Sequence, residues 1–214
     1  MRRFGLEHSL AEHIADGVMH ALGVVFAIAG ATALLVWAAL SVPAERLWPL
    51  VPYAAGLIAT FALSAAYNMT LHRRLRAVLR RFDHAAIYLM IAGTYTPLAL
   101  IGIGGGRGVA LALAAWALAA VGIVLKLAFF QRWPRLGFGL YLAQGWLGLL
   151  ALWPMIERLP PAALALIFGG GVIFTVGTIF YARGWRFSTA IWHGHVLAAA
   201  ALHYVAVIVI AGTV

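Results

Sequence analysis

The chain has 214 residues, of which 64% are hydrophobic and 10% are charged, and it contains no cysteine. Soluble domains carry about 25% charged residues, so this composition excludes a water-soluble protein and predicts an integral membrane protein. The lack of cysteine excludes disulfides and thiolate metal ligands. The net charge of +9 does not indicate a nucleic-acid partner, because nearly all the arginines fall in short connections between apolar runs.

Long apolar runs mark the predicted elements, since a run of about eighteen apolar residues is long enough to span a bilayer as a helix. In chain order we predict spanning helices at residues 17–41, 47–69, 83–103, 108–130, 137–156, 161–182 and 189–211. The connections between them are short and contain Pro, Gly or charged residues. The predicted fold is therefore an all-α membrane protein, one seven-helix domain over residues 1–214, with membrane lipids as its partners. The sequence does not indicate an oligomeric state.

The Lys and Arg residues predict how the bundle is oriented. The N-terminal segment and the regions that join the second to the third, the fourth to the fifth and the sixth to the seventh span hold all of them except Arg46, Arg107 and Arg158. Lys and Arg accumulate on the cytoplasmic side of membrane proteins. We therefore predict a cytoplasmic N-terminus, with Arg2 and Arg3 inside, and a C-terminus on the outer side.

Polar residues gather at the predicted cytoplasmic ends of four helices. They occur as pairs, three of them at the i, i+4 spacing that places both members on one helical face: Asp16 with His20, Ser64 with Asn68, Asp83 with His84, and Thr189 with His193. Ionisable residues inside spanning helices usually face the bundle interior and mark a site or pathway. For each residue taken singly a structural role is the alternative, because a carboxylate also stabilises a helix N-terminus.

Three histidines lie in the last span, and their spacing predicts different roles. His195 is roughly 200° around the helix from His193, so we do not expect both to reach one metal ion. His203 is about 15 Å farther along the helix axis. We expect its side chain to form a hydrogen bond with a neighbouring helix.

Four sequence blocks resemble the bacterial hemolysin III family, which belongs to the superfamily of adiponectin and progestin receptors (PAQR). They appear in the family's order, and the resemblance covers essentially the whole chain: EHIADGVMHALG, LSAAYN, RRFDHAAIYLMIAGTYTPLAL and IWHGHVLAAAALHY. The resemblance implies seven spanning helices with the N-terminus inside, in a bacterial inner membrane. It also implies a zinc ion held by one histidine of helix 2 and two of helix 7, with an aspartate of helix 3 beside the metal-bound water.

This chain departs from that ligand set. By the resemblance, His193 stands at one ligand position and Asp83 at the position of the aspartate. Asn68 and Thr189 stand where the other two histidines are expected, and neither side chain is a usual zinc ligand. A rewired metal site formed by His193, His20 and Asp83 and a metal-free polar cluster are both compatible with the sequence.

The resemblance implies hydrolysis of a ceramide-like lipid amide, with Asp83, Ser64 and Asn68 as candidate catalytic residues. Asp83 would be the general base, and Asn68 would donate a hydrogen bond to a carbonyl or oxyanion oxygen. The alternative is a protein without enzymatic activity, either a lipid-binding or signalling-type seven-helix protein or a cytolytic one. The residues do not form a ring of charges that would line a pore, so a dedicated lytic channel is the least favoured hypothesis.

Overall fold

The computed structural model describes residues 9–130 and 132–213. Within this part of the chain, seven helical segments are long and apolar enough to cross a membrane, which confirms the predicted fold class. The helices are α1 (Leu10–Ser41), α2 (Ala44–Leu47), α3 (Leu50–Met69), α4 (Arg73–Pro97), α5 (Gly105–Ala128), α6 (Pro134–Gly145), α7 (Leu152–Arg158), α8 (Pro161–Arg183) and α9 (Ser188–Gly212).

Two helices begin earlier than the hydrophobic pattern predicted. α1 starts at Leu10 because Ser9 caps it, accepting a hydrogen bond from the Glu12 N–H while the Glu12 carboxylate accepts one from Ser9; this reciprocal pair satisfies N–H groups that would otherwise lack partners. α4 starts at Arg73, so the basic segment that the sequence predicts as a connection forms its first two to three turns. A helix that projects beyond the apolar run satisfies its own backbone, and Arg73, Arg74, Arg80 and Arg81 on it are exposed.

Two spans are irregular where proline or glycine interrupts them. Pro97 lacks a backbone N–H, and α4 continues beyond it as a π-helical turn over Leu98–Ile103. The fifth span, predicted as one helix over residues 137–156, consists instead of α6, a 3₁₀ turn over Leu147–Ala151, and α7. The Tyr95 hydroxyl bridges this break, since it donates to the Gly145 carbonyl and accepts from the Gly148 N–H.

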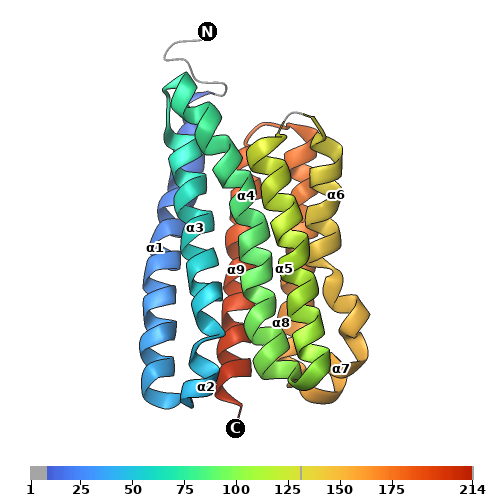
Figure 1. The fold of residues 1–214 in the computed structure, drawn as a ribbon. Helices are drawn as coiled ribbons and strands as arrows, with labels where there is room; N and C mark the ends of the chain where they lie inside the picture. Colours follow the sequence, from blue (N-terminus) through green and yellow to red (C-terminus); the bar gives the residue numbers. More distant parts are fainter. Residues whose placement is uncertain (1–8, 131, 214) are drawn as a thin grey trace.

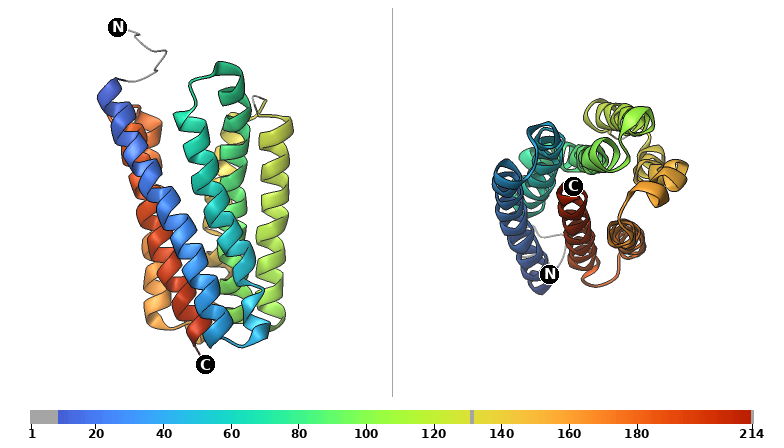
Figure 2. Two further views of the ribbon diagram at one scale, coloured as in Figure 1. Left: turned by 90° about the vertical axis from the view of Figure 1, so that its left-hand side faces the viewer. Right: turned by 90° about the horizontal axis from the view of Figure 1, so that it is seen from below.

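The spans run side by side along one axis, with the start of α1 and the end of α9 at opposite ends of the bundle (Figure 1). α9 packs between α1 and α8, whereas α4 packs between α3 and α5 (Figure 2). Small residues permit the close approach: a Cβ added at Gly93 of α4 would lie 2.7 Å from the Pro52 carbonyl oxygen of α3. α6 packs on α4 and α5, so α4 and α6 stand on one side of the interior and α8 and α9 on the other.

The start of α1, the end of α3 and the starts of α4 and α9 lie at the same end of the bundle, the upper end in Figure 1. This is the end at which the sequence placed the paired polar residues. Its assignment to the cytoplasm stays a prediction; Arg2 and Arg3, which contribute to that prediction, lie outside the described residues.

Candidate functional site

A carboxylate between two histidines lies at the junction of α1 and α9. Oδ1 of Asp16 is 2.6 Å from Nδ1 of His193, and Oδ2 is 3.3 Å from Nε2 of His20. The two imidazole rings are also in contact, with their centroids 4.3 Å apart. Asp16 and His20 are buried and His193 is partly buried, so the group is largely shielded from solvent.

Local structure in both helices brings these side chains together. Asp16 and His20 are four residues apart and therefore share one face of α1. The same Glu12 carboxylate that caps α1 accepts a hydrogen bond from the Phe187 N–H at 3.0 Å, directly before α9 begins. Phe187 has a φ of 60°, a left-handed conformation that non-glycine residues adopt infrequently. Glu12 thus fixes the entry of α9 beside α1, and His193 follows on the second turn of α9.

The group has the donors of a metal site. Among the described residues, Asp16, His20 and His193 are the one set of three His, Cys, Asp or Glu whose ligand atoms all lie within 4.8 Å of one another. Imidazole nitrogen and carboxylate oxygen are both zinc donors. Although Nε2 of His20 lies close to Asp16, it is buried and forms no hydrogen bond; a buried polar atom without a hydrogen-bond partner is unusual. The donor set and this nitrogen both fit a bound cation.

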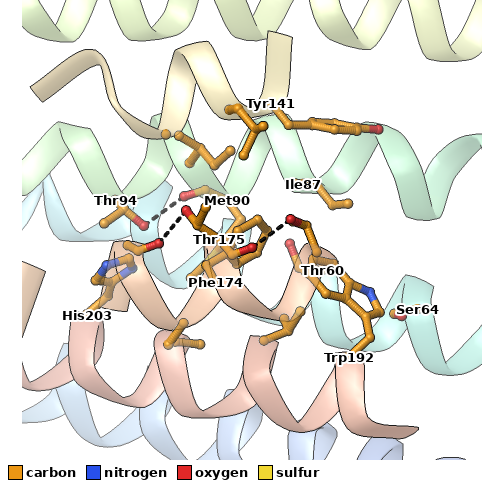
Figure 3. A pocket seen from close by; sticks show the side chains of 18 of the residues that line it. Thr60, Ser64, Ile87, Met90, Thr94, Tyr141, Phe174, Thr175, Trp192 and His203 are labelled. Carbon is orange, nitrogen blue, oxygen red and sulfur yellow. Dashed lines mark hydrogen bonds between the residues drawn. The ribbon is translucent and has the colours of Figure 1, made fainter. Parts of the chain in front are cut away.

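An interior cavity of about 380 Å³ adjoins the group and is lined mainly by apolar side chains of α3, α4, α6, α8 and α9. Its volume is within the range of small-molecule sites. His20 and His193 line it, as do the other residues that the sequence singled out: Ser64, Asn68, Asp83, His84 and Thr189. In Figure 3, Ser64 and Trp192 lie toward one end of the cavity, and Thr94 and His203 toward the other. Ser64 and the other polar residues at this end of the bundle therefore border the same cavity as the mainly apolar side chains deeper in the bundle.

The candidate catalytic residues have different surroundings. Asp83 is buried, and Oδ2 lies 3.2 Å from Nδ1 of its neighbour His84. Asp83 is not in the three-residue group with His20 and His193, where Asp16 supplies the carboxylate. Asn68 donates from Nδ2 to the Ser64 carbonyl oxygen at 3.0 Å, so these two residues form a local pair at the end of α3.

The other two histidines of α9 lie apart from the group. Nδ1 of His195 is 2.8 Å from the Ile191 carbonyl oxygen of its own helix, and its ring packs on Phe180. Nε2 of His203 is 3.2 Å from the Ile167 carbonyl oxygen of α8, an interhelical hydrogen bond of the kind expected from the sequence. It is possible only because residue 170 of α8 is glycine: a Cβ there would lie 2.4 Å from Nε2 of His203.

Sequence reasoning grouped Asp16 with His20 but did not choose Asp16 as a ligand. The available signal was their i, i+4 spacing, which made a carboxylate and an imidazole neighbours on α1. The missing information was the distance between α1 and α9, because the packing of two helices far apart in sequence is not encoded in either one alone.

The comparisons with known proteins agree with the sequence resemblance. The family model of haemolysin-III related proteins matches residues 9–204. The chain is 34% identical to the Hemolysin-3 homolog of Bacillus subtilis (strain 168), over 94% of each chain, and 32% identical to Hemolysin-3 of Bacillus cereus, over 92% of this chain and 90% of that one. It is 28% identical to the monocyte to macrophage differentiation factor of Homo sapiens, over 92% of this chain and 83% of the human protein.

Proposed function

Because the chain belongs to the haemolysin III-related family, we propose that this multi-pass membrane protein hydrolyses a lipid amide with a metal ion held by Asp16, His20 and His193. The observation that carries the proposal is the position of this group, since two of its members line an apolar cavity of about 380 Å³. A lipid acyl chain fits such an interior, and its polar head would then lie among the polar side chains at the α1, α4 and α9 ends.

Each residue of the site has a distinct role in the proposed hydrolysis. Asp16, His20 and His193 would hold the ion, with one oxygen and two nitrogens as donors. A zinc ion bound there would supply positive charge that polarises a carbonyl and would lower the pKa of water. Asp83 lines the same cavity from α4 and would act as general base. Asn68 also lines the cavity. When its side-chain N–H leaves the Ser64 carbonyl oxygen, it can donate to the substrate carbonyl oxygen. Ser64 positions the Asn68 side chain for this role.

The packing of the bundle places two pairs of helices on either side of the cavity. α6 lies against α4 and α5, and α8 lies against α9. The hydrogen bond from Trp146 to Thr175 at 3.2 Å joins the two sides midway. In the orientation that Lys and Arg predict, the metal group faces the cytoplasmic half of the membrane.

Metal analysis tests the proposal directly. Purified protein loaded with zinc is expected to retain about one equivalent after dialysis, and His193→Gln is expected to lose it, because a metal site with two of three protein ligands binds weakly. His195→Gln is the matched control: it removes an imidazole two residues away on the same helix that bonds its own backbone. Loss of zinc in both variants, or in neither, would contradict the ligand assignment.

Lipid binding without catalysis is the second candidate function. It is supported by Asn68 and Thr189 at two expected ligand positions and by the direct hydrogen bond between Asp16 and His193, which closes the group without an ion. Protein that binds less than a tenth of an equivalent of metal yet carries a co-purified lipid would favour this function over hydrolysis.

A cytolytic activity, the third hypothesis, predicts that purified protein releases dye from liposomes; intact liposomes would eliminate it.

A further inference from the structure

Lys126 is a buried cation near the end of α5, outside the polar group described above. Its side chain is only 6% exposed. Its Nζ lies 5.0 Å from the centre of the Tyr141 ring and 5.6 Å from that of Phe130. A buried charge is costly unless it is paired, and the two ring faces offset only part of that cost.

Other sources of positive potential surround the ammonium group. Arg80 of α4 places its guanidinium 5.2 Å from the centre of the same Phe130 ring. The first turns of α6 are also adjacent, because a Cβ built on Gly137 would lie 2.4 Å from Nζ of Lys126. A helix N-terminus carries positive partial charge. The buried ammonium of Lys126, the exposed guanidinium of Arg80 and the start of α6 therefore place positive charge on one side of the bundle, where an anion would be stabilised.

Two groups that could pair with Lys126 contact other residues instead. The C-terminal end of α5 would stabilise a lysine, but Arg81 donates to the Leu127 carbonyl oxygen there at 3.2 Å. Asp83, the acidic residue at this end of α4, lies against His84. In the described ranges 9–130 and 132–213, neither Lys126 nor Arg80 forms an ion pair with a carboxylate.

From these contacts we propose that Lys126 and Arg80, with the first turn of α6, form a binding site for a phosphate group, supplied by the headgroup of an anionic phospholipid. The site lies at the end of the bundle that holds most of the arginines, where α4, α5 and α6 pack against one another. Basic pockets of this kind between spanning helices are suited to anionic headgroups. The apolar outer surfaces of the same helices would contact the acyl chains. This site does not depend on the proposed metal ligands.

Thermal unfolding in mixed micelles tests this site. Purified protein in phosphatidylcholine micelles is titrated with phosphatidylglycerol, with additional phosphatidylcholine, or with inorganic phosphate. Phosphatidylglycerol is expected to raise the unfolding temperature above the level that phosphatidylcholine gives. Lys126→Met keeps a side chain of similar length and removes the charge, so its unfolding temperature in phosphatidylcholine stays equal or rises. Its apparent affinity for phosphatidylglycerol should fall about fivefold.

Arg80→Gln should weaken the same response by a similar factor. Arg74→Gln, an exposed arginine at the start of α4, is the matched control and should keep the wild-type response. A phosphatidylglycerol response that Lys126→Met leaves intact, or that Arg74→Gln reduces equally, would overturn the site. If inorganic phosphate reproduces the response with the same dependence on Lys126, the anion site stands and free phosphate is its ligand; a response to phosphatidylglycerol alone identifies the lipid.

Discussion

Asp16 and Asp83 are two buried carboxylates at the same end of the bundle, and their surroundings differ. Asp16 is contacted by histidines from two helices, His20 of its own helix and His193 of α9. Asp83 contacts only the adjacent His84 among the ion pairs of the described residues, and it lines the cavity, whereas Asp16 does not. One carboxylate therefore joins two helices, and the other faces the interior that a substrate would occupy.

This difference assigns the two acids different roles within the proposed function. A carboxylate between two imidazoles is fixed in position, which suits a ligand or an anchor for ligands. A carboxylate that borders a cavity can exchange a proton with a bound molecule, which suits a general base. Position along the helix alone does not distinguish Asp16 from Asp83, because each lies close to the point where the polar start of its helix, α1 or α4, passes into the apolar span.

Replacing the two acids should separate binding from catalysis, and the largest effect is expected at Asp16. Asp16→Ala removes the carboxylate that contacts the buried His20 and the partly buried His193, so we expect a loss of about 3 kcal/mol of stability and a loss of zinc affinity of about 100-fold or more. Thermal unfolding and metal analysis measure both. Glu157→Gln is the control, since Glu157 forms an exposed ion pair with Arg107 at the other end of the bundle. Full zinc occupancy in Asp16→Ala would show that Asp16 is not a ligand.

Asp83→Asn should have the opposite pattern. The amide keeps the shape of the side chain, so zinc content and unfolding temperature are expected to stay near wild type. Turnover of a ceramide-like amide should fall about 100-fold or more, because the amide cannot accept the proton as the carboxylate does. Release of fatty acid from vesicle-bound substrate measures this. A parallel loss of zinc would mean that both carboxylates belong to one metal site and that the distinction between them is wrong.

A smaller effect, a gain in zinc affinity, is expected when histidines are introduced at the two positions where the resemblance predicts zinc ligands. Asn68→His combined with Thr189→His adds imidazoles at two positions that line the cavity together with His193. Thr189 and His193 share a face of α9, so zinc affinity should rise on the order of tenfold. The same pair of substitutions should restore zinc binding to Asp16→Ala, which would show that Asp16 compensates for their absence. Unchanged affinity in both backgrounds would contradict this relation.

The sequence predicted the seven spans well, because long apolar runs report directly on length and burial. It predicted helix starts less well. The polar residues that precede the apolar runs of α1 and α4 are also helical. At α1 the boundary is set by Ser9, which caps the helix, and at α4 the helix projects beyond its apolar run. The positions of Asp16, His20 and His193 at one end followed from topology. That Asp16, rather than Asp83, joins the histidines depends on the packing of α9 against α1 and could not be read from either segment.

A substitution at Glu12, with the smallest expected effect, tests whether the packing of α9 against α1 brings Asp16, His20 and His193 together. Its carboxylate caps α1 and holds the Phe187 N–H where the backbone has a φ of 60°. Glu12→Gln keeps one acceptor oxygen for these two tasks, so we expect a loss of about 1 kcal/mol of stability and a zinc affinity about threefold weaker. Phe187→Gly in the same background should recover part of the stability, because glycine adopts a positive φ without steric cost. If zinc affinity stays at the wild-type value while stability falls, the start of α9 positions the helix but does not set the distance between His193 and Asp16.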